Sequence, residues 1–172
     1  MGEAVIREWH GNSWLTMAMA ARSIIETTAL AYKTLSQLER AIVESNADRV
    51  HKLIMGSFFA TRDKENIRLG LGYEATNIVT VVDYLKREIG DIRDCYDKAS
   101  EIVHPNASGL LLMYSNRDYV NMTINFGRNS MEPGETFGHV AYSALCLEVA
   151  CDKINILDSF LPDLKNMFVV SA

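Results

Sequence analysis

The chain has 172 residues, of which 48% are hydrophobic and 23% are charged, and its formal net charge is −5. This composition excludes a disordered chain, and the length fits one domain with its own core, which we expect to span residues 1–172. Lys and Arg are scattered, so the charge pattern indicates no basic nucleic-acid surface. No run reaches about 18 consecutive apolar residues and the first residues form no signal peptide, so we expect a cytoplasmic protein that is not bound to a membrane.

Helical periodicity dominates the first third of the chain. Apolar residues recur at helical spacing from about residue 12 to residue 35 and predict a first amphipathic helix. Ser36 and Glu39 match the pattern of a capping box, which predicts a second helix from Ser36 to about Phe59. The charged segment 61–73 contains two glycines and is typical of a loop, with one helical turn as an alternative within it.

Two further helices are predicted before residue 105. The apolar pattern of residues 78–89 predicts a short helix that ends at Gly90, a residue suited to a left-handed cap. Asp91 is a candidate cap for the next helix, whose apolar face continues to Val103. Pro105 should end that helix near His104.

The period changes to two at residues 119–126, where Val120, Met122, Ile124 and Phe126 alternate with other side chains. This pattern predicts a half-buried strand, which should pair through a turn at Asn116 with residues 110–115. Residues 135–161 then predict an apolar helix, closed by Pro162 and buried centrally or at a subunit interface. The predicted fold is mainly α, a bundle of about five helices with one inserted antiparallel β-hairpin at about residues 110–126.

Sequence motifs for a metal site are present but poorly placed. Asp48 with His51 and Glu101 with His104 match the Glu-x-x-His pairs of helical metal sites, with Glu26 as a further ligand. On a helical wheel, Asp48 and Glu101 lie opposite the apolar faces of their helices. We therefore predict no metal in the core and no cofactor.

Motifs for nucleophilic or nucleotide chemistry are missing from the sequence. It contains no Gly-x-Ser-x-Gly elbow, no Gly-x-Gly-x-x-Gly and no Walker motif. Cys95, Cys146 and Cys151 form no CxxC pair and fall in predicted helices, so we expect buried thiols in a reducing compartment.

One polar constellation remains near His104. The wheel places Arg93 and His104 on one flank of the same helix, together with Asp97 and Ser100. Arg22 and Glu26 lie one turn apart on the matching flank of the first helix. If the two flanks face each other, these residues form a half-buried cluster able to move protons or hold a phosphate. The simpler interpretation is an ordinary ion pair on the first helix, with His104 and Asn106 capping a helix and a turn.

The residues around His104 also carry a resemblance. The segment from Tyr96 to Asn106, followed by Gly109, resembles a motif of a group of largely uncharacterised bacterial helical proteins, in which a Tyr and a Ser-Glu precede a His-Pro-Asn turn. The segment 21–26, with its Arg-Ser-x-x-Glu pattern, resembles the first helix of the same group. Together with segment 77–85, the resemblance covers about two-thirds of the chain.

This group in turn is similar to the HEPN superfamily, small helical bundles that often dimerise and include ribonucleases of toxin and antiviral systems. HEPN nucleases carry Arg, four to six further residues and then His, whereas Arg93 and His104 here have ten residues between them. Eleven helical positions correspond to about 16 Å of rise, too far for both side chains to contact one phosphodiester within a single chain. The resemblance implies a HEPN-like scaffold, and the spacing departs from the nuclease pattern.

We therefore expect a binding or regulatory module that self-associates through its last helix and takes RNA or a protein as partner. Its expected binding residues are Glu26, Tyr96, Ser100 and Asn106.

Two enzyme functions are alternative hypotheses to this expectation. The first is a dimeric, metal-independent ribonuclease in which His104 is the general acid or base and Arg93 or Arg22 stabilises phosphate charge. The second, weaker hypothesis is a metal-dependent hydrolase or oxidase that uses His51 and His104.

Overall fold

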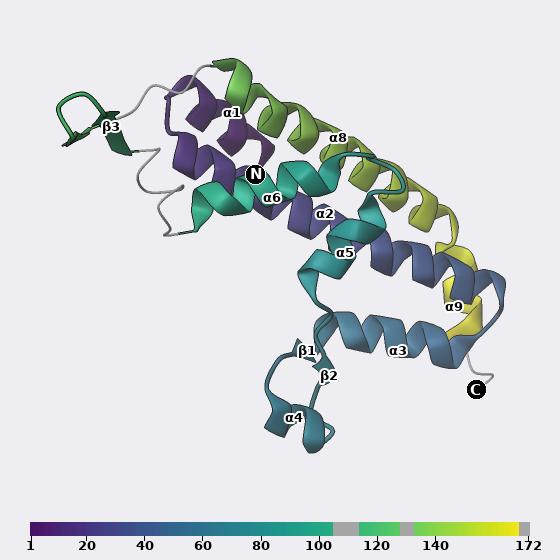
Figure 1. The fold of residues 1–172 in the computed structure, drawn as a ribbon. Coiled ribbons are helices and arrows are strands. Elements are labelled where there is room, and N and C mark those ends of the chain that lie inside the picture. Colours follow the sequence, from purple (N-terminus) through teal and green to yellow (C-terminus); the bar gives the residue numbers. More distant parts are fainter. Residues whose placement is uncertain (105–113, 128–132, 169–172) are drawn as a thin grey trace.

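The computed structural model describes residues 1–104, 114–127 and 133–168, and within these ranges the chain is mainly helical. This confirms the predicted fold class in its main feature (Figure 1). The described elements, in chain order, are α1 (Gly2–His10), α2 (Trp14–Val43), α3 (Ala47–Phe58), β1 (Ala60–Thr61), α4 (Lys64–Arg68), β2 (Tyr73–Glu74), α5 (Ile78–Leu85), α6 (Ile92–Val103), β3 (Ser115–Asp118), β4 (Thr123–Phe126), α8 (Pro133–Ser159) and α9 (Leu161–Phe168).

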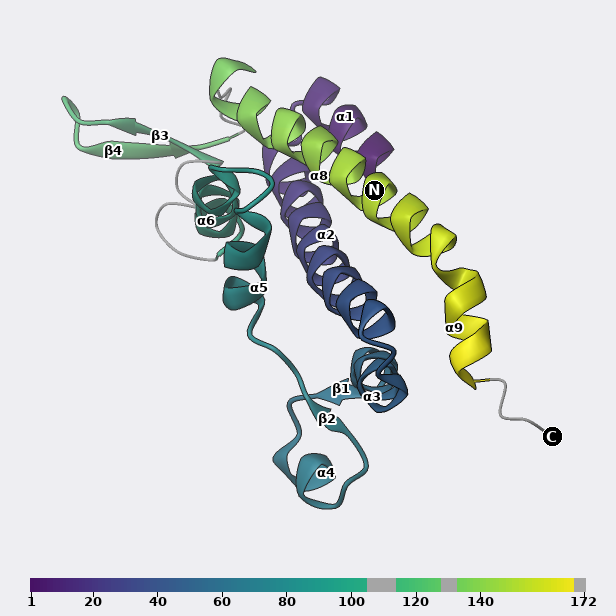
Figure 2. The same cartoon turned by 90° about the vertical axis from the view of Figure 1, so that its right-hand side faces the viewer.

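Helix α2 is the central element of the bundle. Helices α1 and α8 pack along one side of it, and α5 and α6 cover another, while α3 and α9 lie at its far end (Figures 1 and 2). Met17 and Ile25 of α2 are fully buried against Leu85 of α5 and Ile92 at the start of α6. A smaller cluster at the far end packs Ile42 and Val50 against residues of α8 and α9. The chain therefore folds around one long helix, and the described ranges contain more helices than the about five that were predicted.

The predicted break at Ser36 is wrong, because α2 continues through it and Ser36 is buried. The chain instead turns at residues 44–46. Ser45 has a left-handed φ of 51°, and the backbone N–H groups of Ser45 and Asn46 donate to the carbonyls of Ile42 and Ala41 at 2.8 and 2.9 Å. This is a Schellman motif, in which a glycine usually occupies the left-handed position. The Asn46 side chain then caps α3 by accepting from the Arg49 N–H at 2.9 Å.

Segment 60–74, which we call the flap, contains more structure than the predicted loop. The two-residue strands β1 and β2 pair in parallel, and α4 between them is capped by the Asp63 side chain, which accepts from the N–H groups of Glu65 and Asn66. Gly72 permits the close pairing, because a Cβ at that position would lie 2.7 Å from a methyl carbon of Thr61. The flap extends from the bundle beside α3 (Figure 2).

The antiparallel hairpin exists, but its boundaries differ from the prediction. Asn116 lies within β3 and pairs with Asn125, so it does not form the turn. The turn follows Asp118, whose carboxylate accepts from the N–H groups of Val120 and Asn121, each at 3.0 Å. Residues 110–113 of the predicted first strand lie outside the described residues. The hairpin also does not bury the alternating apolar face, since Val120 and Phe126 are 91% and 79% exposed.

The remaining boundaries follow from local chemistry. Helix α6 begins after Asp91 and ends before His104, as predicted. The long C-terminal helix ends at Ser159, so Pro162 does not close it but lies in the first turn of α9, where the missing N–H of proline costs little. None of the helices in the described ranges has the length and hydropathy that a bilayer crossing requires.

The continuity of α2 gives a direct test. If a helix began after Ser36, Gln37 would be its first residue, where proline is tolerated. In the interior of α2, Gln37→Pro removes a backbone hydrogen bond and should lower the free energy of unfolding by about 3 kcal/mol or more. Ala47→Pro, at the first position of α3, should change that free energy little. Urea denaturation of both variants measures the difference, and equally small effects would contradict the continuous helix.

Candidate functional site

Three polar side chains join α2 to α6. Arg22 Nε donates to Glu26 Oε1 at 2.9 Å, and the Tyr96 hydroxyl donates to the same oxygen at 3.0 Å. The guanidinium carbon of Arg22 lies 5.6 Å from the centroid of the Tyr96 ring, within the range of a cation–π contact. The flanks of the two helices therefore face each other, and Arg22, Glu26 and Tyr96 form one cluster.

The environment of this cluster favours the charged form of Arg22. Burial lowers the pKa of Arg22, but the hydrogen bond to Glu26 and the neighbouring Tyr96 raise it by more, so the net pKa is raised. The side chains of Arg22 and Glu26 are 25% and 31% exposed, so solvent still reaches the pair. The cluster is thus a half-buried cation held in place by a carboxylate and an aromatic ring.

A cavity of about 880 Å³ opens beside the cluster, and we call it the groove. Its walls come from α2, the flap, the start of α5 and the second half of α6. The groove is lined by Arg22, Arg62, Lys64, Ile67, Glu74, Ala75, Asn77, Ile78, Val79, Tyr96, Asp97, Ser100, Glu101 and His104. Among the predicted site residues, the structure therefore brings Arg22, Tyr96, Ser100 and His104 to one surface. Glu26 does not line the groove but accepts a hydrogen bond from Tyr96.

Two of these residues present polar groups near the end of α6. The Ser100 hydroxyl oxygen is buried, and in the described part of the chain it has no hydrogen-bond partner. A buried hydroxyl without a partner costs about 1–3 kcal/mol, so an incoming ligand atom or a water that bonded to it would be favoured. His104 is the C-terminal cap residue of α6 and is exposed at the edge of the groove.

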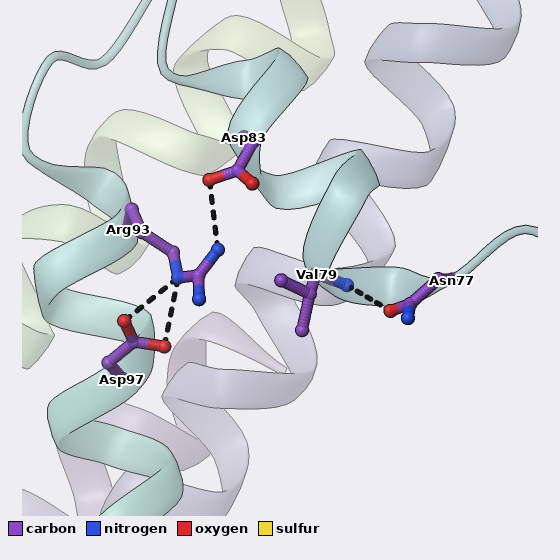
Figure 3. A network of polar contacts seen from close by, with 5 residues as sticks. All are labelled: Asn77, Val79, Asp83, Arg93 and Asp97. Carbon is purple, nitrogen blue, oxygen red and sulfur yellow. Dashed lines mark hydrogen bonds and ion pairs between the residues drawn. The ribbon is translucent and has the colours of Figure 1, made fainter.

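The flap contributes two cations that the sequence analysis did not identify. Arg62 and Lys64 are exposed, and neither is in an ion pair with any residue of the described ranges. The start of α5 also lines the groove, and Asn77 caps it by accepting from the Val79 N–H at 3.0 Å (Figure 3). A helix N-terminus carries partial positive charge, so it adds to the field of the two cations.

Acidic side chains also line the groove, but they are not equivalent. Asp97 accepts two hydrogen bonds from Arg93 Nε, at 2.8 and 2.9 Å, so its charge is balanced from outside the groove. Glu74 and Glu101 complete the acidic set. The groove therefore combines four basic side chains with three carboxylates, and both Arg22 and Asp97 are already held in ion pairs with residues outside it.

Arg93 does not line the groove, although it was predicted to share a polar cluster with Arg22 and His104. Its guanidinium is bound by Asp97 and also donates through Nη1 to Asp83 of α5 at 2.9 Å (Figure 3). The hydrogen bonds that Arg93 donates to Asp97 and Asp83 raise its pKa. Arg93 thus fastens α6 to α5 and does not line the cavity that contains His104. Asn106, a predicted binding residue, lies outside the described residues.

The geometry of the acidic and histidine side chains does not favour a metal. His51 and Asp48 are exposed on α3, which is not part of the groove, whereas Glu101 and His104 line it. Within the described ranges, no group of three or more His, Cys, Asp or Glu side chains is close enough to hold a metal ion.

A buried Cys–His pair was also missed from the sequence. Cys95 Sγ of α6 lies 3.5 Å from His139 Nδ1 of α8, next to a cavity of about 250 Å³. Burial raises the pKa of Cys95 to about 11 and lowers the pKa of His139. At neutral pH the pair is a thiol and an uncharged imidazole, so it lacks the thiolate that nucleophilic catalysis requires.

Long-range folding explains why these residues were missed. Arg62 and Lys64 belong to a segment whose charge suggested only a loop, and the pairing of β1 with β2 directs that segment to the groove. His139 is 44 residues from Cys95 and has no motif that links them. Asn77 could have been found, because an Asn directly before an apolar helix is a common cap.

Comparisons of the chain with protein-family models, curated proteins and solved structures gave no match. Its function is therefore inferred from the residues of the groove and their surroundings.

The burial of the thiols predicts how they react. Cys151 is exposed, contrary to the sequence expectation, whereas Cys95 and Cys146 are buried with pKa values raised by burial to about 11 and about 12. In the native protein at pH 8, an aromatic disulfide reagent should therefore modify Cys151 rapidly and the other two only after unfolding. Cys151→Ser should remove the fast phase, and a second fast thiol in that variant would contradict the buried pair.

Proposed function

We propose that this chain is a binding module whose groove holds the phosphate group of a ligand. The observation that carries the proposal is that Arg22, Arg62, Lys64 and His104, from three separate parts of the fold, line one cavity. The two flap cations have no ion pair within the described ranges, so an anion could engage them without breaking existing contacts.

The other groups of the groove suit the same ligand. Guanidinium and ammonium groups donate several charge-assisted hydrogen bonds to phosphate oxygens. The N-terminus of α5 adds partial positive charge, and Ser100 adds a hydroxyl without a partner in the described chain. A volume of about 880 Å³ lies within the range of sites for small molecules or for one short segment of a polymer.

We further propose that the module is regulatory and acts as a homo-oligomer, as the resemblance to HEPN-like proteins implies. Helix α8 offers one surface for this contact. It buries small and polar side chains such as Thr136 and Ser143 against the bundle, whereas Leu145, Ile154 and other large apolar side chains on it remain exposed. A helix that leaves large apolar side chains in solvent is typical of an interaction surface.

A dimeric, metal-independent ribonuclease is the second candidate function. It is favoured by one observation, which is that His104 and Arg22 line the same cavity. In this proposal His104 is the general acid or base and Arg22 stabilises the charge on the phosphate, while Arg93 is excluded by its two aspartate partners. The HEPN resemblance would then assign the activity to a toxin or antiviral defence system.

Anion binding tests the leading proposal. Inorganic pyrophosphate should bind the wild-type protein saturably in a calorimetric titration, and Arg62→Ala with Lys64→Ala should weaken binding at least tenfold, equivalent to about 1.4 kcal/mol. Lys86→Ala with Lys165→Ala is the matched control, because it removes two exposed cations outside the groove and should leave binding within about twofold. Equal losses in both double variants would indicate a nonspecific effect of net charge and reject the site.

RNA cleavage tests the second candidate. In the presence of a chelator, His104→Ala and Arg22→Ala should each lower the cleavage rate of single-stranded RNA about 100-fold or more. Arg93→Ala should retain activity, because Arg93 does not line the groove. Circular dichroism checks that each variant is folded. Full activity in both the His104 and the Arg22 variant would reject the ribonuclease while leaving the binding proposal in place.

A further inference from the structure

The β3–β4 hairpin exposes the apolar side chains that its sequence pattern marks for burial. Val120 and Met122 at the turn are 91% and 87% exposed, and Ile124 and Phe126 of β4 are 48% and 79% exposed. The hairpin stands away from the helical bundle in both views (Figures 1 and 2). No other described element therefore covers this surface.

An isolated hairpin of this kind needs a partner. Ile124 and Phe126 point to the same face of β4, because side chains two residues apart lie on one side of a strand. Each strand has only the other as a neighbour among the described residues, so each leaves one edge unpaired. A two-stranded hairpin is at best marginally stable in water and gains stability when further strands or another layer cover its apolar face.

The size of the surface fits a second copy of the chain. A large aromatic side chain buries about 150–250 Å², and the three aliphatic side chains are smaller, so at their exposed fractions the four together offer on the order of 600 Å². If the same face of a second copy covers them, the interface totals roughly 1,200 Å², which reaches the range of stable protein interfaces. A two-fold contact of identical faces is the commonest way in which homo-oligomers close.

We propose that the hairpin is a self-recognition arm whose apolar face packs against the hairpin of a second copy. This inference rests on the self-association in the proposed function, and it assigns the contact to the hairpin in place of the exposed side of α8. The open edges of β3 and β4 allow the two hairpins to pair as well as stack.

Two matched phenylalanines provide the test. Phe126→Asp places a charge on the arm, and Phe58→Asp does the same at the end of α3, where the phenylalanine is 80% exposed. Leu145→Asp probes the exposed side of α8. Sedimentation equilibrium of the wild-type protein should show a monomer–dimer equilibrium, with Phe126→Asp weakening it at least tenfold and Phe58→Asp and Leu145→Asp leaving it within about twofold.

Hydrogen exchange provides a readout that does not depend on a variant. The amides of residues 115–126 should be better protected in concentrated than in dilute wild-type protein. A dimer weakened by Leu145→Asp and not by Phe126→Asp would overturn the hairpin contact but keep self-association. A wild-type monomer at all concentrations would overturn both, while the pyrophosphate titration would still test the groove separately.

Discussion

The carboxylate of Glu26 is the contact on which the groove depends. It accepts hydrogen bonds from Arg22 on its own helix and from Tyr96 on α6, so one residue both fixes a guanidinium and joins two helices. Without it, a half-buried arginine would lose its counter-charge and the hydroxyl of a buried tyrosine would lose its acceptor, each at a cost of about 1–3 kcal/mol. The position of the cation relative to Ser100 and His104 thus follows from the packing of α6 on α2.

Two further contacts position the other walls of the groove relative to α2 and α6. Arg93 bridges Asp97 of α6 and Asp83 of α5, which places the N-terminus of α5 beside the second half of α6. The pairing of β1 with β2 joins the two ends of the flap, and Arg62 and Lys64 of the flap form another wall of the groove. Arg93 was predicted to act on phosphate, but as a structural bridge it orients the helices that carry the other groups.

The sequence predicted best those features whose signals are local. Asp91 and Pro105 bracket α6 correctly, because helix starts and proline sterics act within a few residues. The prediction for the preceding helix is wrong, because α5 ends at Leu85 and Gly90 does not adopt a left-handed φ. Helical wheels also predicted that the flank of α2 with Arg22 could face the flank of α6 with His104, and both residues line the groove. The turn at Ser45 escaped prediction, because its left-handed conformation is held by the Schellman hydrogen bonds and not by a glycine. Arg62 and Lys64 were not predicted as groove residues, because their position depends on the strand pairing between residues 60–61 and 73–74.

Amide chemical shifts of ¹⁵N-labelled protein during titration with inorganic phosphate test the central claim most directly. The account predicts saturable shifts concentrated at three places that are separate in sequence, namely residues 62–64 of the flap, residues 77–79 at the start of α5 and residues 96–104 of α6. Shifts of this kind would locate one anion site where these segments meet. Shifts that do not saturate, or that cluster around exposed lysines elsewhere, would contradict a phosphate site in the groove.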